Sequence, residues 1–90
     1  MLSNAEQEHL RRLRWKCRRG ALELDLILNS FLENHYSQLS LQQKSVFERF
    51  LEEDDPVLQQ WLMGQASPED KAFSAMIEYI NQKKIFGQQY

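Results

Sequence analysis

Few side chains in this 90-residue sequence could take part in covalent or metal chemistry. Cys17 is the only cysteine, and it would serve as a nucleophile only if it were exposed and neighbouring cations lowered its pKa. It falls on an apolar helical stripe, however, which favours a small buried core residue. The two histidines, His9 and His35, lie far apart and lack the spacing of metal ligands. We therefore expect no catalytic residue and no metal site.

The glycines and the acidic run at 52–55 also lack the patterns of ligand-binding loops. The three glycines are isolated from one another, so no glycine-rich loop could hold a phosphate. The run Glu52-Glu53-Asp54-Asp55 has neither the alternation nor the glycine of a calcium loop. It is either a solvated junction between two helices, with a helix cap, or an acidic patch that faces a partner.

A glycine stands between an arginine and a glutamate in the segment Arg19-Gly20-Ala21-Leu22-Glu23. We expect Gly20 at a tight turn where a side chain would obstruct close approach, with Arg19 and Glu23 near each other. A guanidinium and a carboxylate can pair with each other or bind polar groups of a partner, but they are not a catalytic dyad. The alternative is a surface ion pair that contributes about 0–1 kcal/mol, with the glycine only ending a helix.

Charge is unevenly distributed along the chain. The first 20 residues hold six cations and two acids, a net charge of +4, whereas residues 21–90 hold five cations and eleven acids, a net charge of −6. A basic arm of this kind suggests an anionic partner or pairing within the fold. The pI of about 5.6 and the lack of a DNA-recognition helix argue against nucleic acid. A nucleic-acid-associated regulator or antitoxin that uses the basic N-terminal helix is the alternative function.

Several apolar and aromatic residues have more than one possible role. Trp15 lies off the apolar stripe of its helix, among arginines, and packing on the next helix is favoured over stacking with an arginine or anchoring a partner. Leu22 and Leu26 fall on a polar helix side and either pack on another helix or form an exposed apolar contact. His35 ends an apolar stripe and is expected to be structural, with its hydrogen bonds satisfied. Trp61 is expected in the core.

Hydrophobic periodicity and capping residues predict helices throughout the chain. Ser3 with Glu6, and Ser40 with Gln43, have the spacing of capping boxes. The expected helices cover about residues 4–18, 21–35, 41–51, 56–63 and 68–84.

Prolines and glycines mark the expected helix ends. Asp55 and Ser67 each precede a proline, so we expect them as N-caps with proline at the first helical position. Gly20 and Gly64 are expected to end helices, because glycine readily adopts positive φ. We expect the tail, residues 85–90, to be loose.

The length suits one all-α domain over residues 1–90, a compact five-helix bundle ordered over about residues 4–84. Such a small core argues against an elaborate cofactor enzyme. No apolar run approaches the ~20 residues that a membrane span needs, and the N-terminus has no apolar segment of a secretory signal. The single cysteine suits a reducing compartment.

Three segments resemble the succinate dehydrogenase flavinylation factors, the small SdhE-type FAD assembly proteins of bacteria and mitochondria. Trp15-Lys16-Cys17-Arg18-Arg19-Gly20 is similar to the family's W-x-C-R-R-G sequence and leads into its R-G-x-x-E signature, which ends at Glu23. The acidic junction before Pro56 and the segment Trp61-Leu62-Met63 follow in the family's order. The resemblance covers about residues 10–82.

This resemblance implies a five-helix bundle that is not an enzyme and binds no cofactor tightly. Such a protein binds the flavoprotein subunit of succinate dehydrogenase, or in some bacteria of fumarate reductase, and promotes covalent attachment of FAD to a histidine of that subunit. It implies a cytoplasmic protein without membrane insertion or nucleic acid, and we expect a monomer. The partner-binding candidates are Arg19, Gly20 and Glu23, extended by Arg18, Leu24, Asp25 and Trp15.

Overall fold

Five α-helices and one 3-10 turn make up the computed structural model, which describes residues 3–83. This part of the chain contains no strand, and the prediction of an all-α five-helix fold is confirmed. The predicted loose tail lies outside the described residues. The elements are α1 (Asn4–Lys16), α2 (Leu22–His35), η1 (Tyr36–Gln38), α3 (Leu41–Phe50), α4 (Asp55–Leu62) and α5 (Lys71–Gln82).

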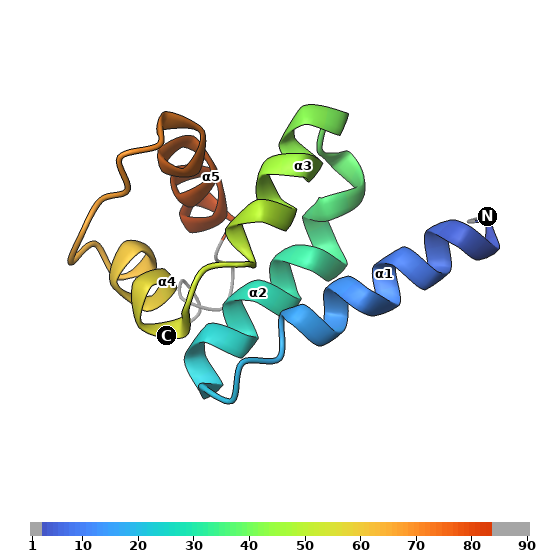
Figure 1. Ribbon diagram of the computed structural model, residues 1–90, viewed down its shortest axis with the longest axis horizontal. Coiled ribbons are helices and arrows are strands. Elements are labelled where there is room, and N and C mark those ends of the chain that lie inside the picture. Colours follow the sequence, from blue (N-terminus) through green and yellow to red (C-terminus); the bar gives the residue numbers. More distant parts are fainter. Residues whose placement is uncertain (1–2, 84–90) are drawn as a thin grey trace.

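The arrangement places α1 alongside α2, with the N-terminal half of α1 extending beyond the other helices (Figure 1). On the other side of the molecule, α3 packs against α5, and α4 packs against both α2 and α5. None of the described helices is long and apolar enough to cross a membrane. The connection between α1 and α2, residues 17–21, lies at the opposite end of α1 from the projecting N-terminal half (Figure 1). We call this connection the corner.

Two capping boxes start α1 and α3 as predicted. The Ser3 hydroxyl accepts the Glu6 backbone N–H at 3.1 Å, and the Glu6 carboxylate accepts the Ser3 N–H at 3.2 Å. In α3 the Ser40 hydroxyl accepts the Gln43 N–H at 3.1 Å, and the Gln43 side chain accepts the Ser40 N–H at 2.9 Å. Each box satisfies two backbone donors that a helix start would otherwise leave free.

The prediction that Asp55 caps α4 is wrong by one residue. Asp54 is the N-cap and makes no side-chain capping hydrogen bond, while Asp55 is the first helical residue. The Asp55 carboxylate instead accepts a hydrogen bond from Arg19 Nε at 2.6 Å. The Asp55 carboxylate, which local sequence predicts as a helix cap, therefore binds Arg19, a residue 36 positions away in the sequence.

The predicted start of α5 after Ser67 is also wrong. The helix begins at Lys71, and Asp70 is its N-cap, with a carboxylate that accepts the Ala72 N–H at 2.8 Å. A carboxylate is a strong acceptor for the amides of a helix start and favourable for its dipole. Ser67 and Pro68 consequently lie in the loop before the helix.

Two glycines within residues 3–83 have positive φ, but only one of them ends a helix. Gly64, at φ 77°, follows α4, and the Gln65 N–H donates to the Gln60 carbonyl at 2.8 Å. This is the Schellman pattern, which confirms the predicted helix stop. Helix α1 already ends at Lys16, before its predicted end at about residue 18. Gly20, at φ 85°, therefore lies within the connection to α2 and is not a helix cap.

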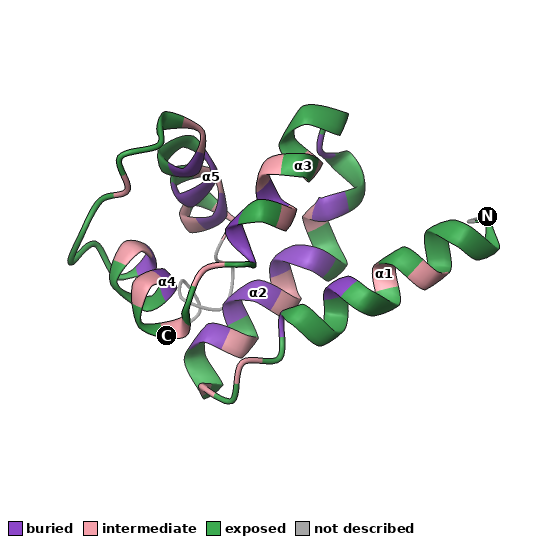
Figure 2. Cartoon of the chain, viewed as in Figure 1, coloured by how far each residue is buried: buried purple, intermediate pink, exposed green. Residues whose placement is uncertain are grey.

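A single apolar core joins the helices, and most of its buried residues lie on the inner faces of α2 to α5 (Figure 2). Phe47 is fully buried between Phe31 and Tyr36, with ring centroids at 5.3 and 5.7 Å. Trp61, predicted to be core, is only partly buried and packs on the edge of this core. The one buried residue of α1 itself is Leu13, so this helix is held mainly by its C-terminal half.

Candidate functional site

The connection between α1 and α2 is fixed from one side by Asp25. Its carboxylate accepts the backbone N–H of Arg19 at 2.6 Å and that of Gly20 at 3.3 Å. Because Asp25 lies in the first turn of α2, its negative charge is also favourable for the helix dipole. Asp25 is half-buried and holds the connection against the helix that follows it.

The connection is fixed from the other side by the Arg19 guanidinium, whose side chain is only 13% exposed. Its Nε donates to the Asp55 carboxylate at 2.6 Å, and its Nη1 donates to the carbonyls of Lys16 and Leu51 at 2.9 and 2.7 Å. Its Nη2 donates to the Glu53 carbonyl. Arg19 therefore ties the α1–α2 connection to the α3–α4 connection.

The prediction that Arg19 and Glu23 lie near each other as a pair is not confirmed, because Arg19 pairs with Asp55. Glu23 is exposed, and its carboxylate has no hydrogen bond or ion pair within residues 3–83. Leu24 is 1% exposed and belongs to the core. Of the predicted site residues, Arg19, Leu24 and Asp25 thus face inward.

Gly20 has open space where a side chain would project. A Cβ built on Gly20 meets no heavy atom within 4 Å, so the predicted obstruction within the chain is wrong. What requires glycine here is the φ of 85°, which other residues adopt only with strain. Gly20 is therefore an exposed, conformationally special position on the outside of the corner.

Trp15 is exposed in the last turn of α1, and the prediction that it packs on α2 is wrong. Its side chain is 67% exposed. The Arg18 guanidinium lies 5.4 Å from the centroid of its ring, which is the arginine stacking that the sequence left as an alternative. An exposed tryptophan beside a cation is a side chain that binds protein partners well.

Leu22 and Leu26 place an apolar strip on the exposed side of α2. They are 78% and 52% exposed and, four residues apart on α2, share one helix face. The sequence left open whether they pack inward, and in the structure they form the exposed contact. Glu23, which stands between them in the sequence, is exposed as well. We call the following residues the corner surface: Trp15, Arg18, Leu22, Glu23 and Leu26.

Cations of the basic arm pair with acids of the body. Arg14 binds Glu33 at 2.8 Å, and Lys16 binds Glu52 at 2.7 Å. The hydrogen bond from Lys16, together with its charge, lowers the pKa of Glu52. The acidic run at 52–55 is thus a junction that receives the end of the basic arm, and the nucleic-acid alternative is not supported.

Cys17 is fully buried, as predicted for a core residue. Burial raises the pKa of its thiol to about 12, which opposes the thiolate that a nucleophile needs. A hypothesis of catalysis by Cys17 therefore has no support in this geometry.

We expect native Cys17 to react with iodoacetamide far more slowly than a cysteine peptide at pH 8. Because folding raises the pKa of the Cys17 thiol, the contribution of this thiol to the free energy of unfolding is fully present at pH values below the ordinary pKa of cysteine. It is lost as the pH rises through the folded pKa of about 12. The measurement is mass spectrometry of native and urea-unfolded protein against time. Equal alkylation rates in the two states would contradict the buried thiol.

The two histidines have different surroundings. His9 Nε2 lies 2.8 Å from the Glu48 carboxylate, which also accepts the Tyr36 hydroxyl at 2.9 Å. Both ring nitrogens of His35 are buried without a hydrogen-bond partner within residues 3–83, so the prediction of a satisfied histidine is wrong. The centroids of the His35 and Phe31 rings lie 5.7 Å apart. In the described part of the chain no cluster of three acidic, histidine or cysteine side chains could hold a metal ion.

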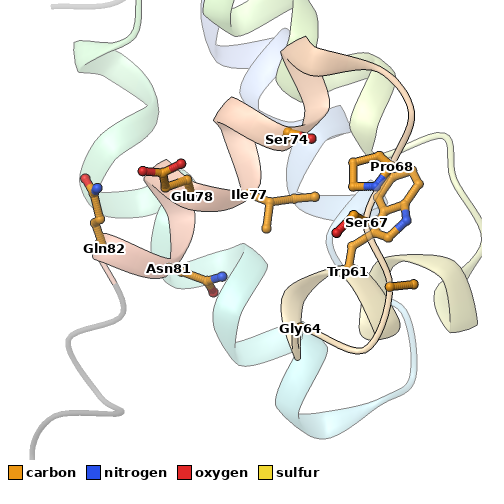
Figure 3. A pocket seen from close by; sticks show the side chains of 10 residues that line it. Trp61, Gly64, Ser67, Pro68, Ser74, Ile77, Glu78, Asn81 and Gln82 are labelled. Atoms are coloured by element: carbon orange, nitrogen blue, oxygen red, sulfur yellow. The ribbon is translucent and has the colours of Figure 1, made fainter.

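The main grooves of the described residues lie away from the corner. One of about 450 Å³ is bounded by α5 and the loop before it and includes Trp61, Pro68 and Ile77 (Figure 3). Another of about 450 Å³, which contains His9 and Glu48, lies between α1, η1 and α3. Neither contains a corner-surface residue. These two grooves are therefore separate from the corner surface.

Comparisons with known proteins point to one family. A family model described as flavinator of succinate dehydrogenase matches residues 11–84, which include the whole corner surface. The chain is 42% identical over 72 residues to the FAD assembly factor SdhE of Coxiella burnetii, covering 80% of this chain and 88% of that protein. It is 50% identical over 69 residues to the FAD assembly factor SdhE of Legionella pneumophila strain Lens, covering 77% and 86%.

A third relative, the FAD assembly factor SdhE of Idiomarina loihiensis, is 47% identical over 70 residues, covering 78% of each chain. The resemblance drawn from the three sequence segments is thereby confirmed over most of the chain. The chain belongs to the family of flavinators of succinate dehydrogenase.

Proposed function

We propose that this chain is an assembly factor that binds the flavoprotein subunit of succinate dehydrogenase and promotes covalent attachment of FAD to it. The membership of the flavinator family carries this proposal. The corner surface supports it independently, because exposed tryptophan, leucine and arginine side chains are suited to protein binding. The fumarate reductase flavoprotein is a second partner of the same class.

The contribution of this chain to the reaction is positioning. Cys17, the single cysteine, is a buried neutral thiol, which is unsuited to act as a nucleophile. Bond formation is therefore left to the flavin and the acceptor histidine of the flavoprotein. By binding a flexible region of that subunit, the corner surface would hold the acceptor in a reactive arrangement and lower the entropic part of the barrier.

Glu23 supplies the negative charge of this contact. Its carboxylate is free of partners within the described chain, so it can bind a cation or a backbone amide of the flavoprotein without breaking an internal bond. We further propose that the protein acts as a monomer in the cytoplasm. The single cysteine of the protein is a buried free thiol, which suits a reducing compartment.

Glu23→Ala is expected to fold normally and to lose the flavoprotein complex. Loss of an exposed carboxylate without an internal partner should change the free energy of unfolding by less than about 0.5 kcal/mol. Binding of the purified flavoprotein subunit would be measured by calorimetry, and covalent FAD by flavin fluorescence of the denatured subunit on a gel.

The matched control is Glu78→Ala, which removes an exposed helical glutamate from α5, outside the corner surface. This variant should bind and flavinylate like the unaltered protein. Full flavinylation by folded Glu23→Ala would count against the corner surface as the binding site.

A further inference from the structure

The R-G-x-x-E segment contains two kinds of residue that the sequence does not distinguish. Glu23 and Gly20 face outward, whereas the Arg19 side chain is 13% exposed and turned into the molecule. Four of the five N–H donors of Arg19 are already used by groups of this chain. The Arg19 guanidinium therefore has one remaining N–H donor with which it could bind a partner.

The acceptors of Arg19 come from three separate elements. The Lys16 carbonyl ends α1, the Leu51 carbonyl belongs to the C-cap of α3, and Asp55 begins α4. Carbonyls at helix ends lack partners within their own helix, so a cation there satisfies them and is favourable for the helix dipole. Only the planar fork of arginine can reach the carboxylate and the carbonyls together, which a lysine ammonium cannot do.

The backbone and side chain of Arg19 are held from opposite sides. Asp25 of α2 binds the backbone N–H, while Asp55 of α4 binds the side chain. The peptide units on either side of Arg19 are thereby fixed relative to the first turn of α2, which carries Glu23. The direction in which Arg18 and Glu23 project depends on this arrangement.

We infer that Arg19 and Asp55 are positioning residues, which hold the corner surface in its binding geometry and do not themselves contact the flavoprotein. This inference rests on the proposed function. It assigns a role to Asp55, which lies outside the R-G-x-x-E segment and 36 residues from Arg19. A corner held in one conformation before binding avoids the entropy cost of ordering it in the complex.

The test compares Asp55→Asn with Asp54→Asn, which makes the same substitution at the neighbouring exposed N-cap that forms no side-chain capping bond. The probe is the purified flavoprotein subunit of succinate dehydrogenase. Asp55→Asn should bind it at least about tenfold more weakly, as loss of one charge-assisted hydrogen bond would produce, and Asp54→Asn should bind like the unaltered protein. The free Asp55→Asn protein should also exchange its Arg19 and Gly20 amide protons faster.

Arg19→Lys is the second variant and separates positioning from contact. If Arg19 only supplied a positive charge to the partner, the Arg19→Lys variant would still bind the flavoprotein. If Arg19 is a positioning residue, this variant should bind the flavoprotein more weakly, because lysine cannot reach the same acceptors. The double variant Arg19→Lys/Asp55→Asn should bind no more weakly than the weaker single variant, because both changes break one link. Unchanged affinity of either single variant, or additive losses in the double variant, would overturn the inference.

Failure of the inference can be told from failure of the proposed function. If the unaltered protein binds the flavoprotein, Glu23→Ala does not, and Asp55→Asn binds normally, then only the positioning role is overturned. If the unaltered protein does not bind the flavoprotein at all, both are overturned. A melting curve for each variant shows whether it is folded.

Discussion

Gly20→Arg should abolish binding of the flavoprotein while lowering the free energy of unfolding by only about 1–2 kcal/mol. That modest cost comes from forcing a side chain into a backbone with φ 85°. A Cβ at this position has no heavy atom within 4 Å, so the new side chain starts into open space. We therefore expect its bulk and positive charge to act mainly on a partner that contacts the corner surface.

Gly64→Arg is the matched control for this prediction. Gly64 has φ 77°, is exposed, and also has no heavy atom within 4 Å of the place that a Cβ would occupy, but it follows α4 and lies outside the corner. Both variants should lose similar stability in urea titrations, and only Gly20→Arg should lose the complex and covalent FAD. Equal loss of flavinylation in the two variants would mean that strain, and not the surface around Gly20, is responsible.

Phe47→Ala should have the largest effect on stability, a loss of about 3–5 kcal/mol in the free energy of unfolding. Phe47 is fully buried on α3 and contacts the rings of Phe31 and Tyr36 at 5.3 and 5.7 Å. Its removal would leave a cavity where α2, η1 and α3 meet. Since small domains have a total stability of about 5–15 kcal/mol, this variant would approach global unfolding near body temperature.

Leu41→Ala provides the comparison within the same helix. Leu41 is the first residue of α3 and is 85% exposed, so its truncation should cost less than about 0.5 kcal/mol. Urea unfolding followed by circular dichroism would measure both variants. A loss below about 1 kcal/mol for Phe47→Ala would show that the ring is not packed as the structure places it.

Local sequence signals predicted most helix starts and the fold class. The capping boxes at Ser3 and Ser40 were recognisable because both partners of each box lie within three residues. The errors at Asp55 and Ser67 have a common physical origin in competition between acceptors. Asp55 is recruited by Arg19 from across the fold, and Asp70 is a stronger cap than Ser67. The first of these contacts is invisible to a local pattern.

The sequence predicted which segment forms the candidate site. It did not predict which residues of that segment are turned into the molecule and which are exposed. Spacing alone placed Arg19 four residues from Glu23 and suggested a pair, whereas the competing carboxylates of Asp25 and Asp55 bind the connection instead. The exposure of Trp15 depended on which parts of α1 the other helices cover, which periodicity within one helix does not report. The advance signs of an exposed apolar contact were the placement of Leu22 and Leu26 on a polar helix side and the position of Trp15 off the apolar stripe of its helix.

The way in which α1 is attached has a consequence for how the molecule opens. Its N-terminal half projects from the bundle, and Leu13 is the one buried residue within the helix (Figure 1). The remaining links include contacts between exposed groups, such as Arg14 with Glu33, and these contribute about 0–1 kcal/mol each and weaken as salt rises. Local unfolding of this first helix therefore needs less free energy than unfolding of the core, and it would progress from the free end and stop where Cys17 and Arg19 enter the bundle.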